Sequence, residues 1–200
     1  MPTPIGHALA GLAVAWAAEP PHGAQQHLRR ALARPLTLVC IALAVLPDID
    51  LLYPPTHRMA THSIGAIIVV TIIVAGVTGW VTGRINWRIA VVCAAAYASH
   101  LVTDWLGADR NYAPYGIQMF WPFDKTWYIS GWDVFPQVER RNPFSMATIR
   151  TDIAAAIWEI VILGSVVLVV WFVRTRSPRR NSRSAQRSQR SNTENSRDTR

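Results

Sequence analysis

Charged side chains are scarce in this sequence of 200 residues: they make up 16% of it, against about 25% in an average soluble domain. The stretches 63–83 and 153–173 contain a single charged residue, Glu159. Each is long enough to cross a bilayer, which takes about 20 residues. The stretch 88–106 is a third candidate, polar mainly at its start and at His100 and Asp104. A soluble protein rarely needs three such segments, so the sequence predicts a membrane protein.

Cysteine is almost absent. The two cysteines, Cys40 and Cys93, lie far apart in apolar runs, which excludes a disulfide framework or a zinc knuckle and predicts small core residues. The chain also lacks a Ser-His-Asp nucleophile elbow, a glycine-rich phosphate loop and a dinucleotide-binding fingerprint, so it does not belong to the enzyme classes built on those motifs.

Five apolar segments can be drawn: 5–18, about 31–47, 63–83, 88–106 and 153–173. The first two are short for spanning helices and are expected to be tilted, packed inside the bundle or re-entrant. Ala15-Trp16-Ala17 resembles a signal-peptide cleavage site, but no Lys or Arg precedes the segment, so we expect it to be retained. The sequence predicts an all-α fold, a multi-pass membrane helical bundle of about five helices that forms one domain over residues 1–173.

The remaining residues, 174–200, form a basic tail. Nine arginines against Glu194 and Asp198 give it a net charge of +7, out of +8 for the whole chain. No aromatic residue follows Phe172, so the tail cannot bury a core and is expected to be disordered. Beside a membrane helix, an arginine run favours a cytoplasmic position and contact with anionic lipid rather than specific nucleic-acid binding.

The basic residues also predict an orientation in the cell (plasma) membrane. With the C-terminus in the cytoplasm, five spans place Arg84, Arg88 and the arginines at 29, 30 and 34 inside, as the positive-inside rule requires. The arginines at 140, 141 and 150 fall outside and disagree with the rule. One span more or fewer on the C-terminal side would place the acids and histidines discussed below at the cytoplasmic face instead of the outer face.

The segment 107–152 is predicted to be external and is rich in aromatic residues: Phe120, Trp121, Phe123, Trp127, Tyr128 and Trp132. Such side chains favour the membrane interface. The segment either lies on the lipid headgroups or forms a lid that holds a lipid-like substrate over a site.

Acids and histidines gather at the segment ends that this topology places near the outer face. His22 and His27 are the only histidines on the opposite side. Charged and metal-binding side chains are costly near hydrocarbon, so each needs a partner or a function. The candidate metal ligands are His7, Asp48, Asp50, His57, His62, His100 and Asp104.

The spacing of these residues suits metal binding. Asp48 and Asp50 follow an apolar segment directly, where both could turn toward one cation or merely solvate a helix end. His100 and Asp104 are four residues apart, on one face of a helix. They could share an ion, Asp104 could orient His100, or the two could form a structural polar pair.

Imidazole and carboxylate ligands suit zinc, manganese or iron. Seven candidates exceed what one tetrahedral zinc needs, so two or three ions are expected, with zinc favoured and manganese as the alternative. Closely spaced metals activate a water and stabilise both oxygens in a phosphoester displacement. Arg58 is a candidate catalytic residue that would bind the phosphate or, alternatively, a lipid headgroup. Asp50 is the second candidate catalytic residue, as a metal-holding carboxylate; Glu159 and Asp133 have no assigned role.

Several of these motifs occur together in a known order. Pro4-Ile5-Gly6-His7, Leu46-Pro47-Asp48-Ile49-Asp50, His57-Arg58-x-x-Thr61-His62-Ser63, Ser99-His100-x-x-x-Asp104-Trp105 and Trp121-Pro122-Phe123 resemble the YdjM-like family of membrane-bound metal-dependent hydrolases. The resemblance covers residues 4–123. Through distant similarity to zinc-dependent phospholipase C and P1-type nucleases, it implies a helical fold and a phosphoesterase site with zinc ions on His and Asp ligands.

The leading hypothesis is therefore a membrane-bound metal-dependent hydrolase, a phosphoesterase that acts through metal-activated water on a lipid-derived or membrane-proximal substrate. The alternative is a non-catalytic metal-binding membrane protein, either a sensor or a transport component. Transporter sites normally lie near the bilayer midplane, whereas these residues collect at one end. A third hypothesis is a structural protein whose acids and histidines only hydrogen-bond to one another.

Overall fold

The computed structural model describes residues 2–18, 34–53, 56–110, 113–139 and 144–176. Within these residues the chain forms five α-helices, short 3₁₀ helices and no β-strand beyond two isolated bridges, which confirms the all-α prediction. The elements are α1 (Pro4–Ala18), α3 (Pro35–Val45), η1 (Leu46–Leu52), η3 (Ala60–His62), α4 (Ile64–Thr82), α5 (Trp87–Leu106) and α6 (Met146–Arg176).

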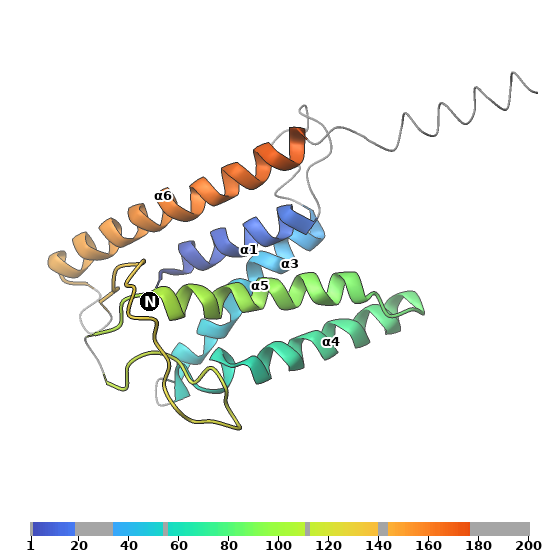
Figure 1. Ribbon diagram of the computed structural model, residues 1–200, viewed down its shortest axis with the longest axis horizontal. Helices are drawn as coiled ribbons and strands as arrows, with labels where there is room; N and C mark the ends of the chain where they lie inside the picture. The colour runs from blue at the N-terminus through green and yellow to red at the C-terminus, as the bar shows by residue number, and fades with distance from the viewer. Residues whose placement is uncertain (1, 19–33, 54–55, 111–112, 140–143, 177–200) are drawn as a thin grey trace, which may run out of the picture.

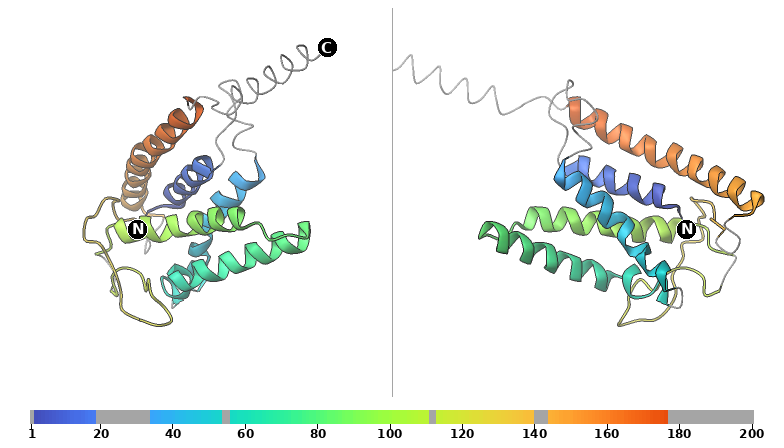
Figure 2. Two further views of the ribbon diagram at one scale, coloured as in Figure 1. Left: turned by 45° about the vertical axis from the view of Figure 1, so that its right-hand side comes forward. Right: turned by 180° about the vertical axis from the view of Figure 1, so that it is seen from behind.

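The helices lie side by side, and each runs opposite to the preceding one in the chain (Figure 1). Helix α1 packs against α3, α5 and α6, and α5 packs against α1, α3 and α4. The irregular segment after α5 lies at the end of the bundle where α1, α4 and α6 begin, as the two further views also show (Figure 2). This arrangement brings four distant parts of the sequence to one end of the molecule.

Helix α1 is the most buried helix, since eight of its 15 residues are buried. Pro4 occupies its first turn, where the missing N–H costs nothing. A Cβ on Gly11 would lie 2.7 Å from the Cys40 carbonyl oxygen and from the Ala44 Cβ, so glycine allows α1 and α3 to approach closely. Small residues thus form the contact between α1 and α3, and Cys40 and Cys93 are buried as predicted.

The polar residues at the ends of the helices fix where the helices begin. Ser63 Oγ accepts a hydrogen bond from the Ala66 N–H at 3.1 Å and caps α4, and Asn86 Oδ1 accepts from the Ile89 N–H at 3.2 Å and caps α5. Helix α6 begins at Met146 after Ser145, whose Oγ accepts from the Thr148 N–H at 3.1 Å. The predicted start near 153 was therefore too late, because the polar first turns of α6 hide its helical character.

The second predicted segment also continues further than expected. Helix α3 ends at Val45, where Pro47 removes a donor from the α-helical ladder, and the chain continues as the 3₁₀ helix η1 to Leu52. Asp48 and Asp50 therefore lie inside a helical turn rather than in a loop after it. Residues 31–33 fall outside the described residues.

Four helical stretches are long and apolar enough to cross a membrane: Pro35–Leu52, Ile64–Thr82, Trp87–Leu106 and Met146–Arg174. Helix α1, with 15 residues, is shorter. Ala75 is the one buried residue of α4, whereas Ile72 and Trp80 are 64% and 88% exposed. A soluble protein rarely leaves a whole apolar helix in water. The described helices thus support a membrane location; the tail from 177 and His22 and His27 lie outside the described residues.

Candidate metal centre

Five of the predicted ligands converge at one end of the bundle from four different elements of the chain. His7 lies in the first turn of α1, Asp48 in η1 and His62 at the end of η3. His100 and Asp104 lie in the last two turns of α5. The three histidines are fully buried and Asp104 is 2% exposed. The spacing of four residues therefore places His100 and Asp104 on the same face of α5, as predicted.

The ligand atoms of these five residues lie close together. His100 Nε2 is 3.0 Å from His62 Nε2 and 3.1 Å from Asp104 Oδ2. His62 Nε2 is 3.3 Å from Asp104 Oδ2. His7 Nε2 is 3.4 Å from Asp104 Oδ1 and 3.8 Å from Asp48 Oδ2. Asp48 Oδ1 lies 3.7 Å from His62 Nε2 and 3.8 Å from His100 Nε2, closing the set.

The outer nitrogens of the three histidines identify their tautomers. His100 Nδ1 lies 2.8 Å from the Ala44 carbonyl oxygen, which can only accept, so Nδ1 carries the proton. Thr103 Oγ1 donates to backbone carbonyls of α5 and therefore accepts from His7 Nδ1 at 2.9 Å. His62 Nδ1 lies 3.1 Å from Asp50 Oδ2. In neutral histidines all three Nε2 atoms then present lone pairs to the cluster, the arrangement typical of metal-binding histidines.

Several atoms of the cluster have no hydrogen-bond partner although they are buried. They are His7 Nε2, Asp48 Oδ1 and both carboxylate oxygens of Asp104. A buried acceptor without a donor is costly, and a buried carboxylate more so. When the histidines are neutral with the tautomers given above, all of these atoms are acceptors and face other acceptors. A cation is the simplest species that would satisfy them together.

The spacing of the atoms fits such a cation. Zinc bonds to His nitrogen and carboxylate oxygen at about 2.0–2.2 Å, so neighbouring ligands in a tetrahedron lie roughly 3.3–3.6 Å apart. The distances of 3.0–3.8 Å within the cluster bracket that range. Three overlapping groups could hold an ion: His7–Asp48–His100, Asp48–His57–His62 and His62–His100–Asp104. The residues present therefore suit one or more divalent ions.

In the protein without metal, a proton compensates part of this negative charge. Burial alone would lower the pKa of His62, but its contacts with Asp104, Asp48 and Asp50 raise that pKa well above the ordinary value of 6.5. An imidazolium held between carboxylates occupies the position in which a cation is favourable. Metal binding would replace that proton.

Asp50 does not point into the cluster with Asp48. Successive residues of a 3₁₀ helix are rotated by about 120°, so residues two apart face different directions. The Asp50 carboxylate instead accepts from His62 Nδ1, from Thr61 Oγ1 at 2.5 Å and from the Arg58 N–H at 3.1 Å. The Asp50 carboxylate thus contacts His62 on its outer nitrogen and belongs to none of the three ligand groups above, while its predicted ligand and catalytic roles stay predictions.

His57 lies at the edge of the centre. Its Nδ1 is 2.5 Å from Asp50 Oδ1, and it can join Asp48 and His62 in a group of three ligands. Its side chain is 11% exposed, more than that of any residue in the central cluster. His57 is therefore placed between the buried ligands and the surface.

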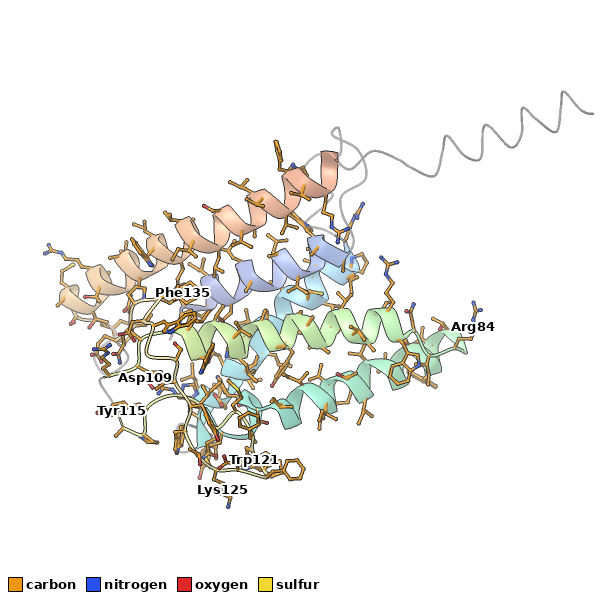
Figure 3. The ribbon with its side chains drawn as sticks, in the orientation of Figure 1. Arg84, Asp109, Tyr115, Trp121, Lys125 and Phe135 are labelled. Atoms are coloured by element: carbon orange, nitrogen blue, oxygen red, sulfur yellow. The ribbon has the colours of Figure 1, made fainter. Side chains whose placement is uncertain are left out.

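Arg58, the other predicted catalytic residue, turns toward Asp109 instead of the cluster. Its Nη1 forms a buried ion pair with Asp109 Oδ2, which also accepts from the Gly116 N–H at 2.8 Å. The Arg58 carbonyl accepts from the Gln118 N–H at 3.0 Å. Arg58 therefore ties the loop before η3 to the segment after α5. Asp109 and Tyr115 lie at this end of the bundle, and Arg84 at the other (Figure 3).

Sequence reasoning missed three supporting residues. Thr61 and Thr103 hold His62 and His7, and Tyr97 donates from its hydroxyl to the Thr61 carbonyl oxygen at 2.6 Å. Thr103 and Tyr97 lie three residues from His100, on neighbouring turns of α5, and this spacing was the available signal. Asp109 carried no signal, because nothing in the pattern around it predicts a buried ion pair.

One comparison with known proteins identifies a family. The sequence model of the YdjM inner membrane protein family matches residues 1–177 of the chain. This match extends well beyond residues 4–123, which contain the motifs quoted above. No curated protein and no solved structure matches the chain.

Proposed function

Because this chain belongs to the YdjM inner membrane protein family, we propose that it is a multi-pass membrane hydrolase that depends on divalent metal and cleaves phosphoester bonds. The observation that carries the proposal is the convergence of three imidazole Nε2 atoms on buried carboxylate oxygens without a hydrogen-bond partner, Asp48 Oδ1 and both oxygens of Asp104. In a purely structural polar cluster, most buried acceptors are paired with donors, and a single proton on His62 cannot supply a donor to all of these oxygens.

His7, Asp48, His62, His100 and Asp104 would hold the metal, with His57 as a further ligand at the open edge. When bound, closely spaced divalent ions lower the pKa of a water and stabilise the oxygens of a phosphoryl group during displacement. The chain itself keeps the ligands rigid through Thr103, Asp50 and the Ala44 carbonyl oxygen. Such outer contacts fix ring orientation and increase ligand basicity.

Zinc is the favoured ion and manganese the alternative. Imidazole and carboxylate ligands in this ratio suit both metals. The number of ligands and the overlap of the three groups favour two or three ions. Cys40 and Cys93 belong to none of these groups, so a soft-metal site is not proposed.

The end of the bundle that carries the ligands is proposed to lie near the outer face of the membrane, with the C-terminus in the cytoplasm. At the opposite end, Arg88 Nη2 donates to the Ala18 carbonyl oxygen at 3.0 Å, and Arg174 donates to that of Ala17. Arg34 directly precedes α3 at that end, and Arg84 lies there too (Figure 3). A basic helix-bundle end supports a cytoplasmic position.

The proposed substrate is a lipid-derived or membrane-proximal phosphoester. Phe123 and Trp132, in the segment after α5, are 93% and 74% exposed, and Leu52 at the end of η1 is 85% exposed. Aromatic side chains exposed at a bundle end favour the headgroup region. The ligand cluster lies at the same end, so a substrate anchored in the leaflet would reach it over a short distance.

One observation favours a non-catalytic metal centre as the second candidate. The three central histidines have no exposed surface, whereas a catalytic site needs an open position for water and substrate. A sensor or a transport component would not need that opening in its resting state. The two candidates differ in whether the metal-loaded protein turns over a substrate.

The test is hydrolysis by detergent-purified protein loaded with zinc or manganese, with phosphatidylcholine, phosphatidate and a soluble chromogenic phosphodiester as substrates. We expect metal-dependent release of phosphate or phosphoester that is lost in Asp104→Asn. The matched control is Asp124→Asn, whose carboxylate bonds only Thr126 and Tyr128 in an exposed loop. Bound metal without turnover of any substrate would favour the non-catalytic centre.

A further inference from the structure

Glu159 is a fully buried carboxylate in the apolar part of α6, and it belongs to none of the three groups of candidate ligands. Its Oε1 accepts from the Thr3 N–H at 2.8 Å, and its Oε2 accepts from the Thr3 hydroxyl at 2.5 Å. Both bonds join α6 to the start of α1 over 156 residues of sequence. The carboxylate is thus the acceptor for the residue directly before α1, at the end of the helix where the first N–H groups have no partner within the helix.

Gly6 makes the contact with Glu159 close. A Cβ on Gly6 would lie 2.6 Å from Glu159 Oε2 and 3.2 Å from the Pro2 Cβ, so any larger residue would displace the carboxylate. The Gly6 N–H also donates to the Thr3 hydroxyl at 3.4 Å. The positive end of the α1 dipole faces this negative charge, which favours the arrangement.

His7 follows Gly6 directly, so the position of this first turn sets the position of the histidine. Each residue of an α-helix advances 1.5 Å and rotates by about 100°. His7 Nδ1 must lie within reach of Thr103 Oγ1 while Nε2 faces Asp104 Oδ1, at 2.9 and 3.4 Å. A shift of α1 by about 1 Å along its axis would remove one of these contacts.

We propose that Glu159 is a positioning residue, which holds the start of α1 against α6 so that His7 points its Nε2 into the metal centre. The proposal rests on the function proposed above, since it assigns Glu159 a purpose in metal binding. It also accounts for a buried acid in a membrane helix, a feature that is rare without a function.

Glu159→Leu removes the carboxylate and keeps its approximate volume, and Glu159→Gln keeps one acceptor for the Thr3 N–H. If Glu159 only fills space, Glu159→Leu should maintain or raise stability, because an apolar side chain is easier to bury. We expect instead that Co²⁺ affinity falls about 10- to 100-fold in Glu159→Leu and less in Glu159→Gln, the range seen when outer contacts of ligands are lost. The Co²⁺ absorption bands should change because His7 leaves the coordination sphere.

Two further variants test the geometry. Gly6→Ala should reproduce the loss of Co²⁺ affinity, and Gly6→Ala combined with Glu159→Asp should recover part of it, because the shorter acid leaves room for the added methyl group. The control is Asp152→Asn, which removes another carboxylate of α6 that accepts from the Glu139 N–H. It should bind Co²⁺ as the wild type does.

Hydrogen exchange of residues 3–10 in metal-free protein separates this proposal from the proposed function. Faster exchange of these residues in Glu159→Leu, in a protein that remains folded, supports the proposal that Glu159 holds the start of α1 against α6. Unchanged exchange overturns it, as does wild-type Co²⁺ affinity with an unchanged spectrum in Glu159→Leu. If wild-type protein binds no Co²⁺ at all, the metal function fails and so does the proposed purpose of Glu159, whatever the exchange rates.

Discussion

His62 lies between two carboxylates that have different tasks: Asp50 Oδ2 is 3.1 Å from its Nδ1, and Asp104 Oδ2 is 3.3 Å from its Nε2. Asp50 lies on the outer side of the cluster and fixes the orientation of the His62 ring. Asp104 lies inside the cluster, where the Nε2 lone pair of His62 also points. The same division occurs at His7, with Thr103 on its outer nitrogen. In each of these histidines a hydrogen bond at Nδ1 fixes the orientation of the ring, and Nε2 faces the other ligands.

Substituting Asp50 should weaken metal binding without abolishing it. Asp50→Asn leaves His62 with a poorer acceptor for its Nδ1–H, so we expect a 10- to 100-fold lower affinity with an unchanged number of ions. Competition titration against a fluorescent zinc chelator measures both quantities. Complete loss of metal from Asp50→Asn would instead identify Asp50 as a direct ligand.

Thr103→Val should act in the same direction on His7. Valine matches threonine in shape but cannot accept the hydrogen bond from His7 Nδ1, and a buried donor left without a partner costs about 1–3 kcal/mol. We expect lower stability in metal-free protein, measured by thermal unfolding in detergent, and a metal affinity reduced about tenfold. Thr151→Val is the control, because the Thr151 hydroxyl bonds only the Ala147 carbonyl oxygen on the exposed side of α6.

Bound metal should stabilise the fold. A ligand that binds only the folded state at 100 times its Kd adds about 2.7 kcal/mol. We therefore expect zinc to raise Tm and a chelator to lower it, and the difference should disappear in Asp104→Asn. An equal rise in Tm with zinc in that variant would point to binding elsewhere.

The ion pair of Arg58 and Asp109 should matter to stability more than to chemistry. Breaking a buried pair by removing one partner costs about 3–5 kcal/mol, and both side chains are buried here. Asp109→Leu alone should destabilise the protein strongly, whereas Arg58→Met with Asp109→Leu should recover much of the loss. If Arg58 binds phosphate instead, Arg58→Lys will raise KM for the substrate with no change in unfolding.

Much of the fold followed from the sequence, because hydrophobic length is a strong signal. The stretches 63–83 and 88–106 match α4 and α5 within one residue at each end, since Ser63 and Asn86 are good N-caps. The start of α6 was wrong, because Arg150 and Asp152 make its first turns resemble a loop. The number of spans and the orientation remain predictions, since apolar length alone does not place a helix across a membrane.

The sequence indicated which residues gather at the candidate metal centre. It indicated less well which partners each of them contacts there. Spacing on a helix placed His100 and Asp104 together because α-helical geometry is regular. The same reasoning could not foresee that Pro47 would tighten the chain into η1 and turn Asp50 away from Asp48. The pairing of Arg58 with Asp109 depends on long-range packing between residues 51 apart, which no local pattern encodes.

The most direct test of the account is the metal content of detergent-purified protein, measured by elemental mass spectrometry beside Asp104→Asn and the control Asp124→Asn. We predict two or three zinc or manganese ions in the wild type and in Asp124→Asn, and their loss in Asp104→Asn. Absence of metal from the wild type, even after reconstitution with zinc and manganese, would contradict the central claim and leave a cluster of buried histidines and acids held together by protons.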